Sequence, residues 1–386
     1  MSTPDKPISA KVNAAHWTVY RSKISYFSGK LEAYLKYKKI PHSITEIDRH
    51  VFNTIYKNTG VKKMPAMESD TGIWLFDTTP MIAWLEKQYG GVPVLPEHPA
   101  LAFITLLIED YGDEWLWRPA MWWRWVPMGS RRTLGWTIGN EIIDEKIGRV
   151  AGWAFAKRQQ QEWLWDDGVN EKNENMVRDM LLREFEFLEP LLEEQPYIMG
   201  SHPSMADYGY FASMFRHFGN DPDSAEFMRM QAPNTYEWLA RLWNAKTSQL
   251  GTEPTWIWPE SDYWSPLLDR IANDYLPYLK QNASAHLRKK KRFDFVGKNI
   301  EFPKTKTTNY RVWCYEVLQR EFQKLSETDK DKVLSIFQHV GGLSALTSEK
   351  PIDSGMNKKY ELPVTVNTPN KIKTKVGVLL TGQPRN

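Results

Sequence analysis

The chain has 386 residues, of which 41% are hydrophobic and 25% charged, and its formal net charge is +3. This composition predicts a globular protein of two or three domains, and so small a charge argues against nucleic acid or a membrane surface as the main partner. The single cysteine, Cys314, excludes an internal disulfide, and with only eight histidines we expect no metal site. The sequence has no signal-peptide pattern and no apolar run of about 18 residues, so we expect a cytoplasmic protein without a membrane span.

Short strands and helices alternate in the first 90 residues. The patterns predict strands at 16–20, 43–47, 65–68 and 73–76, and helices at 28–38 and 49–59. A further helix follows at 78–90, with Thr79 as its expected N-cap, Pro80 in its first turn and Gly90 at its end. This order predicts a small α/β layer domain with a mixed sheet.

Helical patterns dominate from about residue 99. The predicted helices span 100–117, 174–194, 204–218 and 233–246, and after a linker 266–288, 308–326 and 328–340. Ser204 and Asp207 have the spacing of a capping box that opens a buried helix, so Asp207 is expected to be structural. The alternation in 293–302, with a central glycine, indicates a hairpin.

Three stretches of the small domain are candidates for chemistry. The first, "RSKISYFSGK", contains Ser22, Ser25 and Ser28 at a strand-to-helix turn, where a hydroxyl either donates to a thiolate or only caps the helix. The second is Met64-Pro65. A cis bond there would turn the Met64 backbone outward to pair with an extended peptide.

The third stretch is Asp77-Thr78, at the start of a helix. The free N–H groups would attract the α-carboxylate of an amino acid and the aspartate would hold its α-ammonium, unless the stretch is simply a well-capped helix.

Four motifs in their order and spacing resemble the glutathione transferase superfamily, especially its serine-type classes, over about residues 15–246. They are "ISYFSGKLEAYLKYKKI", "VKKMPAM", "FDTTPMIAWL" and "PSMADYGYFA". The resemblance implies a thioredoxin-like N-terminal domain with a mixed four-stranded sheet, an all-α C-terminal domain and an additional α/β extension. It also implies glutathione as co-substrate, a homodimer and a role in detoxification.

The resulting domain organisation has five parts. We expect a flexible N-terminus at 1–14, a thioredoxin-like glutathione-binding domain at 15–92, an all-helical domain at 99–248, an extension with helices and a hairpin at 249–344, and a poorly ordered polar tail at 345–386.

The resemblance assigns roles by position. Ser25 takes the place of the catalytic serine that donates to the glutathione sulfur, and Tyr20 lies where tyrosine-type classes carry their catalytic residue, so both are candidates. Lys63 takes the place of a lysine that reaches a glutathione carboxylate. Met64, before Pro65, would pair with the cysteinyl unit.

Asp77 and Thr78 would hold the γ-glutamyl group. They replace the usual Glu-Ser pair. The carboxylate and hydroxyl groups are the same, but the aspartate side chain is shorter than that of glutamate. Tyr26 is a second departure, because it replaces a proline that commonly follows the serine.

The second substrate is expected between the two domains, near the tryptophan- and arginine-rich segment 110–127. Trp115, Arg118, Trp122 and Arg124 are the candidates for a pocket that takes an apolar or planar substrate, to which the arginines would add a preference for an anionic one. The alternative is core packing, since Trp115 and Trp122 share one helical face.

The predicted function is therefore glutathione-dependent transfer, or a related addition, elimination or lyase reaction, on a small hydrophobic or aromatic electrophile. The alternative is a non-catalytic ligand-binding or scaffold protein of the same fold. About 140 residues follow residue 246, and this length keeps the alternative open because such an extension could cover the pocket or mediate assembly.

Overall fold

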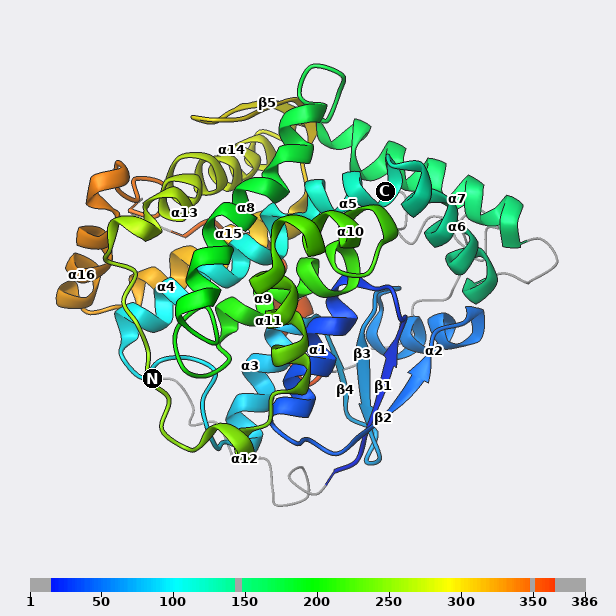
Figure 1. The fold of residues 1–386 in the computed structure, drawn as a ribbon, viewed down its shortest axis with the longest axis horizontal. Helices are drawn as coiled ribbons and strands as arrows, with labels where there is room; N and C mark the ends of the chain where they lie inside the picture. Colours follow the sequence, from blue (N-terminus) through cyan, green and yellow to red (C-terminus); the bar gives the residue numbers. More distant parts are fainter. Residues whose placement is uncertain (1–14, 143–147, 348–350, 365–386) are drawn as a thin grey trace.

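The structure, a computed structural model, describes residues 15–142, 148–347 and 351–364. The predicted flexible N-terminus and the end of the predicted tail, 365–386, lie outside the described residues. The elements form a mixed sheet at one side, a large helical layer beside it, and an extension that packs on the helical layer (Figure 1). None of the described helices is long and apolar enough to cross a membrane.

The N-terminal domain is built on a four-stranded sheet with the strand order β2-β1-β3-β4. Its strands are β1 (Trp17–Arg21), β2 (His42–Glu46), β3 (Ala66–Ser69) and β4 (Trp74–Phe76). Strands β1 and β2 are parallel, and β3 is antiparallel to both β1 and β4. The predicted mixed sheet is thus confirmed.

Three helices cover the two faces of this sheet: α1 (Tyr26–Tyr37), α2 (Arg49–Thr59) and α3 (Thr78–Tyr89). Because side chains alternate along a strand, Val19 and Met67 pack into the main core with α1 and α3. Ala66 and Trp74 face the opposite side, where they pack with Ile55 of α2.

The start of α3 differs from the prediction. The helix begins at Thr78, with Asp77 in the N-cap position at a φ of 68°, so Thr79 is not the N-cap. The Thr79 hydroxyl instead donates to Glu109 (2.5 Å) and accepts a hydrogen bond from Lys30 (2.9 Å), which is fully buried. A buried ammonium group is costly without hydrogen-bond partners, so the hydrogen bonds of Thr79 with Lys30 and Glu109 are favoured over a capping hydrogen bond.

The helical domain contains four helices that the sequence patterns predict at least in part and four that they do not. The predicted ones are α4 (Pro99–Asp110), α8 (Glu174–Glu194), α9 (Met205–Ser213) and α11 (Pro233–Asn244). The others are α5 (Trp117–Trp125), α6 (Met128–Ile142), α7 (Gly148–Trp163) and α10 (Pro222–Gln231). A short helix, α12 (Thr247–Leu250), ends the domain.

The pair α6 and α7 packs unusually closely. A Cβ on Gly152 would lie 1.8 Å from the carbonyl oxygen of Gly135. The two helices can therefore pack this closely only because residue 152 has no side chain. The pair projects at one end of the molecule, opposite the extension (Figure 1).

The capping box of α9 is confirmed. Asp207 accepts hydrogen bonds from the backbone N–H groups of Ser204 (2.9 Å) and Ile198 (2.8 Å), and from Trp238 Nε1 (3.1 Å). Burial raises the pKa of Asp207 to about 6, although these hydrogen bonds oppose the shift.

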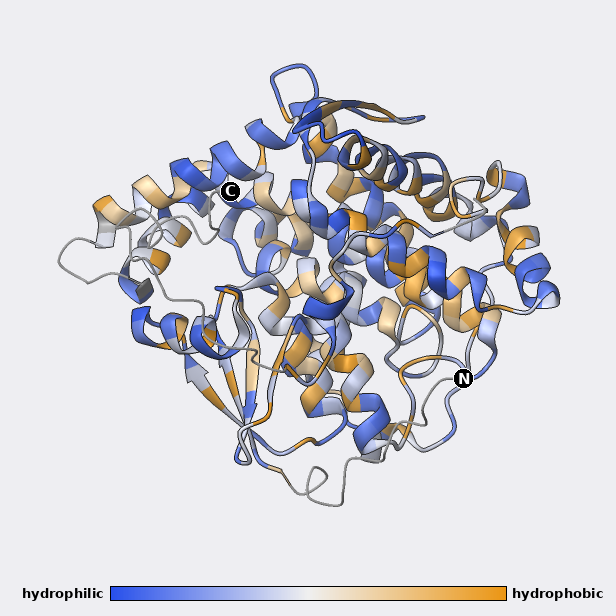
Figure 2. Ribbon diagram, turned by 180° about the vertical axis from the view of Figure 1, so that it is seen from behind, coloured by the Kyte–Doolittle hydropathy of each residue, from blue (hydrophilic) through white to orange (hydrophobic). Residues whose placement is uncertain are grey.

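The extension comprises four helices and the predicted hairpin. These are α13 (Ser265–Arg270), α14 (Leu276–Leu287), β5 (Arg292–Val296), β6 (Glu301–Lys306), α15 (Asn309–Gln323) and α16 (Glu327–Phe337). Its apolar residues join the main core, as in the contact between Phe103 of α4 and Phe322 of α15 (ring centroids 5.4 Å apart). Hydrophobic and hydrophilic residues alternate along most helices, including the outer pair α6 and α7 (Figure 2).

Residues 351–364, predicted as part of a poorly ordered tail, instead pack back on the N-terminal domain. The ring of Tyr360 stacks on Trp313 of α15 (4.1 Å) and contacts Phe76 of β4 (5.7 Å). The backbone N–H of Val364 donates to the carbonyl of Trp74 (2.9 Å). The packing of the rings of Tyr360, Trp313 and Phe76 orders this segment in spite of its polar composition.

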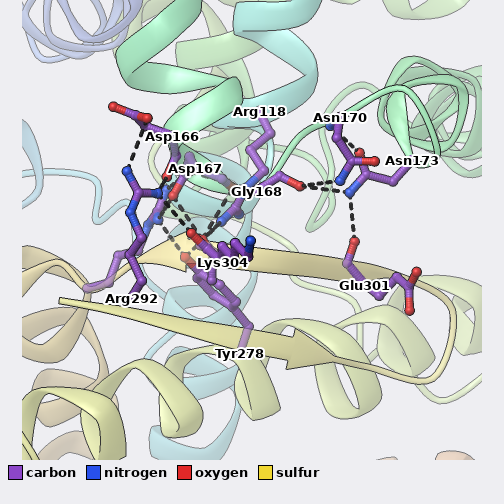
Figure 3. A network of polar contacts seen from close by, with 12 residues as sticks. Arg118, Asp166, Asp167, Gly168, Asn170, Asn173, Tyr278, Arg292, Glu301 and Lys304 are labelled. Carbon is purple, nitrogen blue, oxygen red and sulfur yellow. Dashed lines mark hydrogen bonds and ion pairs between the residues drawn. The ribbon is translucent and has the colours of Figure 1, made fainter. Parts of the chain in front are cut away.

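A buried ionic network ties the extension to the helical domain, and we call it the Asp167 clamp: Asp167, Arg118 of α5 and Arg311 of α15. Both guanidinium groups contact the carboxylate, Arg311 through two N–H groups at 2.9 Å and Arg118 through Nε at 3.2 Å. Tyr278 accepts from both arginines, and Figure 3 shows Arg118, Asp167 and Tyr278 converging beside the β5–β6 hairpin. Burial raises the pKa of Asp167, but the opposite effect of Arg118 and Arg311 is larger. The pKa of Asp167 is therefore below its ordinary value.

Candidate functional site

A cavity of about 420 Å³ lies between the N-terminal domain, the helical domain and the start of α15. We call the part of the cavity lined by Lys63, Asp77 and Tyr310 its polar end, and the part lined by rings of α1, α5 and α7 its apolar end. Charged residues of α6 and α7, such as Glu141 and Arg158, also line the cavity. The extension thus contributes directly to the wall, through Thr308, Tyr310 and Arg311.

Most of the predicted small-domain residues line this one cavity: Ser25, Lys63, Met64, Pro65, Asp77 and Thr78. They come from three separate segments, and the sheet brings these segments together because β1, β3 and β4 are neighbours. The Met64–Pro65 peptide bond is cis.

Ser25 is the N-cap residue of α1, in extended conformation (φ −79°, ψ 129°), and its hydroxyl makes no capping hydrogen bond. The other two serines of the cluster are placed differently. The Ser22 hydroxyl donates to Glu141 (2.9 Å), and Ser28 is fully buried within α1. Among the three, Ser25 therefore combines a position on the cavity wall with a hydroxyl that no described residue engages.

Asp77 lies at the polar end of the cavity beside the first N–H groups of α3. Burial raises the pKa of its carboxyl, whereas Lys63 and a hydrogen bond from Tyr310 lower it. The Tyr310 hydroxyl donates to Asp77 Oδ1 at 3.3 Å, and the Lys63 ammonium lies 4.6 Å from the centre of the Tyr310 ring. Tyr310 is 233 residues away in sequence, and no motif points to this contact.

Two family models match the chain in the expected order. The model described as "Glutathione S-transferase, N-terminal domain" matches residues 19–93, and the model "Glutathione S-transferase, C-terminal domain" matches residues 145–245. The chain belongs to the glutathione transferase superfamily. No curated protein matches it.

Solved structures similar to this chain include several glutathione transferases. One from Methylobacterium radiotolerans, in complex with glutathione sulfonate, is 14% identical, with 63% of this chain and 98% of that chain covered and a TM-score of 0.38. Gtt2 from Saccharomyces cerevisiae is 15% identical, with 65% and 99% covered and a TM-score of 0.38. The transferase URE2P6 from Phanerochaete chrysosporium, in complex with oxidized glutathione, is 13% identical, with 60% and 96% covered and a TM-score of 0.38.

Tyr20, the second predicted catalytic residue, does not line the cavity. It lies on the α2 side of the sheet, where its ring stacks on Trp74 (5.4 Å) and its hydroxyl donates to Glu68 (2.6 Å). Burial and this carboxylate raise the pKa of the hydroxyl. Because side chains alternate along a strand, the Tyr20 side chain points to the α2 side of the sheet, whereas Ser25 lines the cavity.

Three of the four predicted substrate-pocket residues do not line the cavity either. Trp115 packs among rings of the extension such as Tyr278 (5.7 Å) and Phe302 (5.9 Å), and Trp122 donates from Nε1 to Glu174 of α8 (3.2 Å). Arg118 belongs to the Asp167 clamp. For these residues the core-packing alternative holds.

Arg124 does line the cavity, but its guanidinium is engaged by protein groups. It donates to both carboxylate oxygens of Asp221 (2.6 and 2.8 Å) and to the carbonyls of Ile24 and Arg216. An anionic substrate would have to compete with all of these partners.

The apolar wall is formed by the neighbouring face of the same helix. Trp117, Met121 and Trp125 follow one another at intervals of four residues and line the cavity, together with Phe155 and Trp163 of α7. The π-helical turn Tyr111–Trp115 precedes α5. Such a turn rotates the following residues relative to a regular helix, so the spacing expected of a regular helix does not hold across it.

Glu114, in that π-helical turn, is a cavity residue that the sequence did not single out. Burial raises the pKa of its carboxyl to about 7; Asp77 also raises it, while Arg311 and Lys63 oppose the shift. No described residue donates a hydrogen bond to it.

We predict that Glu114→Gln removes a pH dependence of stability. In the wild type the folded state holds the Glu114 proton up to a higher pH than the unfolded state, so this group costs stability as the pH rises from about 4.5 towards 7. Above pH 7 the variant should be more stable than the wild type by up to about 3 kcal/mol, and near pH 4 the difference should vanish. Urea denaturation at several pH values measures this, and a constant difference between the proteins would contradict it.

Proposed function

We propose that this protein is a glutathione transferase, which binds glutathione at the polar end of the cavity and joins it through its sulfur to a hydrophobic or aromatic electrophile at the apolar end. The observation that carries this proposal is the convergence of Ser25, Met64-Pro65 and Asp77-Thr78 on one cavity wall. The family assignment supports the same ligand.

Each part of the tripeptide has a partner of suitable chemistry. The γ-glutamyl α-carboxylate accepts from the N–H groups at the start of α3, and the α-ammonium lies against Asp77. The backbone of Met64 pairs with the cysteinyl unit, and the Lys63 ammonium reaches the glycyl carboxylate.

The thiol then lies near Ser25. A free thiol has a pKa of about 8.5, so only a few per cent is thiolate at neutral pH. Donation from the Ser25 hydroxyl and the positive end of the α1 dipole stabilise the thiolate and lower this pKa. The thiolate attacks an electrophilic carbon of the second substrate; the C–S bond forms, and in a substitution the leaving group departs with its bonding electron pair.

The apolar end suits a planar substrate. The rings of Trp117, Trp125 and Phe155 offer an aromatic wall, and offset or edge contacts with an aromatic substrate are favourable there. His217, also on this wall, stays neutral because burial, and then Arg124, lower the pKa of its imidazole well below the ordinary value.

A non-catalytic binding or scaffold role is the second candidate, and one observation favours it. The extension, which lies outside the two matched domains, contributes Thr308, Tyr310 and Arg311 to the cavity wall. A homodimer, cytoplasmic location and detoxification, which the family resemblance implies, stay predictions; light scattering coupled to size-exclusion chromatography tests the first.

Conjugation of glutathione to 1-chloro-2,4-dinitrobenzene, an aryl chloride that releases chloride on substitution, separates the two candidates. The transferase proposal predicts a rate above the uncatalysed reaction in the wild type and a clear loss of this rate in Ser25→Ala. Glutathione binding without any acceleration, with this and other aryl and alkyl halides, would favour the scaffold.

A further inference from the structure

The first turn of α15 is part of the cavity wall, although it belongs to the extension. Arg311, in this turn, is held by the Asp167 clamp through two N–H groups at 2.9 Å, and it is almost completely buried. The backbone of the adjacent Tyr310 is consequently fixed with respect to the helical domain.

The ring of Tyr310 is also held on its other sides. It contacts the rings of Trp313 (5.7 Å) and Tyr360 (5.8 Å), and the Lys63 ammonium lies over its face. The single polar atom of the side chain, the hydroxyl, donates to Asp77 Oδ1. Oδ2 of the same carboxylate receives no hydrogen bond from a described residue.

We propose that Tyr310 is a positioning residue of the glutathione site, which holds the Asp77 carboxylate by one oxygen so that the other faces the α-ammonium of the ligand. This inference rests on the proposed function. An ionised carboxylate accepts through both oxygens, so the tyrosine and the ammonium do not compete for the same lone pairs. The extension therefore completes the γ-glutamyl subsite, and the site spans segments 233 residues apart.

Charge gives a second reason for the hydrogen bond. Asp77 is useful to an ammonium only when it is ionised, and its burial disfavours the ionised form. Several charged groups face it from the surrounding elements: Lys63, Lys30, Glu109 and Glu114. Donation from Tyr310 adds to the effect of the two lysines and favours the ionised form of the carboxylate.

The test compares two ligands in equilibrium dialysis: glutathione and its deamino analogue, which lacks the α-ammonium. We expect Tyr310→Phe to weaken glutathione binding about 5- to 10-fold and to leave the affinity for the deamino analogue unchanged. Because the variant raises the pKa of Asp77, its deficit for glutathione should shrink as the pH rises. A merely structural role would weaken both ligands equally at every pH.

Tyr34→Phe is the matched control. It removes another tyrosine–carboxylate hydrogen bond, 2.7 Å to Glu86, at a position that does not line the cavity, and should change neither affinity. Equal losses for both ligands in Tyr310→Phe, or no loss at all, would overturn the inference while leaving the proposed function intact. A wild type that binds neither ligand would overturn both.

Discussion

Replacing Asp167 with alanine should lower the free energy of unfolding by about 3–5 kcal/mol. The change leaves the guanidinium groups of Arg118 and Arg311 buried without their counter-ion, and removing one partner of a buried ionic network is far more costly than losing a surface pair. The effect should extend to the cavity, because Arg311 fixes the start of α15. Glutathione affinity should therefore fall with stability.

The adjacent residue offers the control. Asp166 makes a partly exposed ion pair with Arg292 (3.1 Å), for which solvent screening leaves a contribution of about 1 kcal/mol or less. Urea denaturation of the wild type, Asp167→Ala and Asp166→Ala measures the contrast. Similar losses in the two variants would mean that the clamp does not hold the extension in place.

Ser25→Ala should raise the pKa of the thiol of bound glutathione by about 1–2 units, which corresponds to about 1.4–2.7 kcal/mol of lost thiolate stabilisation. The variant keeps the α1 dipole and removes only the hydroxyl, so the difference reports the hydrogen bond to sulfur. The ultraviolet absorbance of the thiolate, followed against pH with saturating glutathione, measures this pKa.

Two further variants show whether the effect is specific. Ser28→Ala changes a buried hydroxyl of the same helix that does not line the cavity, and Tyr20→Phe removes the hydroxyl that donates to Glu68. Both should leave the thiolate pKa unchanged. Loss of the thiolate only in Tyr20→Phe would transfer the catalytic role to that tyrosine and contradict the placement of Ser25.

The parts of the fold that depend on local patterns were predictable. Short runs of strand-forming residues, with alternation in 43–47, predicted the strands of the N-terminal sheet, and Ser204 with Asp207 predicted the capping box that opens α9. These features depend on residues within a few positions of one another, and a single sequence contains all that is needed to find them.

The errors arose where distant residues decide the local structure. Thr79 does not cap its helix, because its hydroxyl forms hydrogen bonds with Lys30 and Glu109 on other helices. Trp115 packs against Tyr278 and Phe302 of the extension, whereas Trp117, two residues later, lines the cavity. Neither competition is visible in the spacing of the residues concerned.

The candidate site shows the same division. Motifs identified the residues of the small domain that line the cavity, since each motif is a short segment. The contribution of Tyr310 could not be predicted, because it depends on how the extension packs on the helical domain. The same packing placed Tyr360 against Trp313 in a segment whose composition is polar.

Equilibrium dialysis of the wild type against labelled glutathione tests the central claim most directly. The account predicts saturable binding at one site per chain, with half-saturation at about 1 mM or below. Linear, non-saturable uptake over that range would contradict it, because a cavity that unites Ser25, Met64-Pro65 and Asp77-Thr78 would then not be a glutathione site.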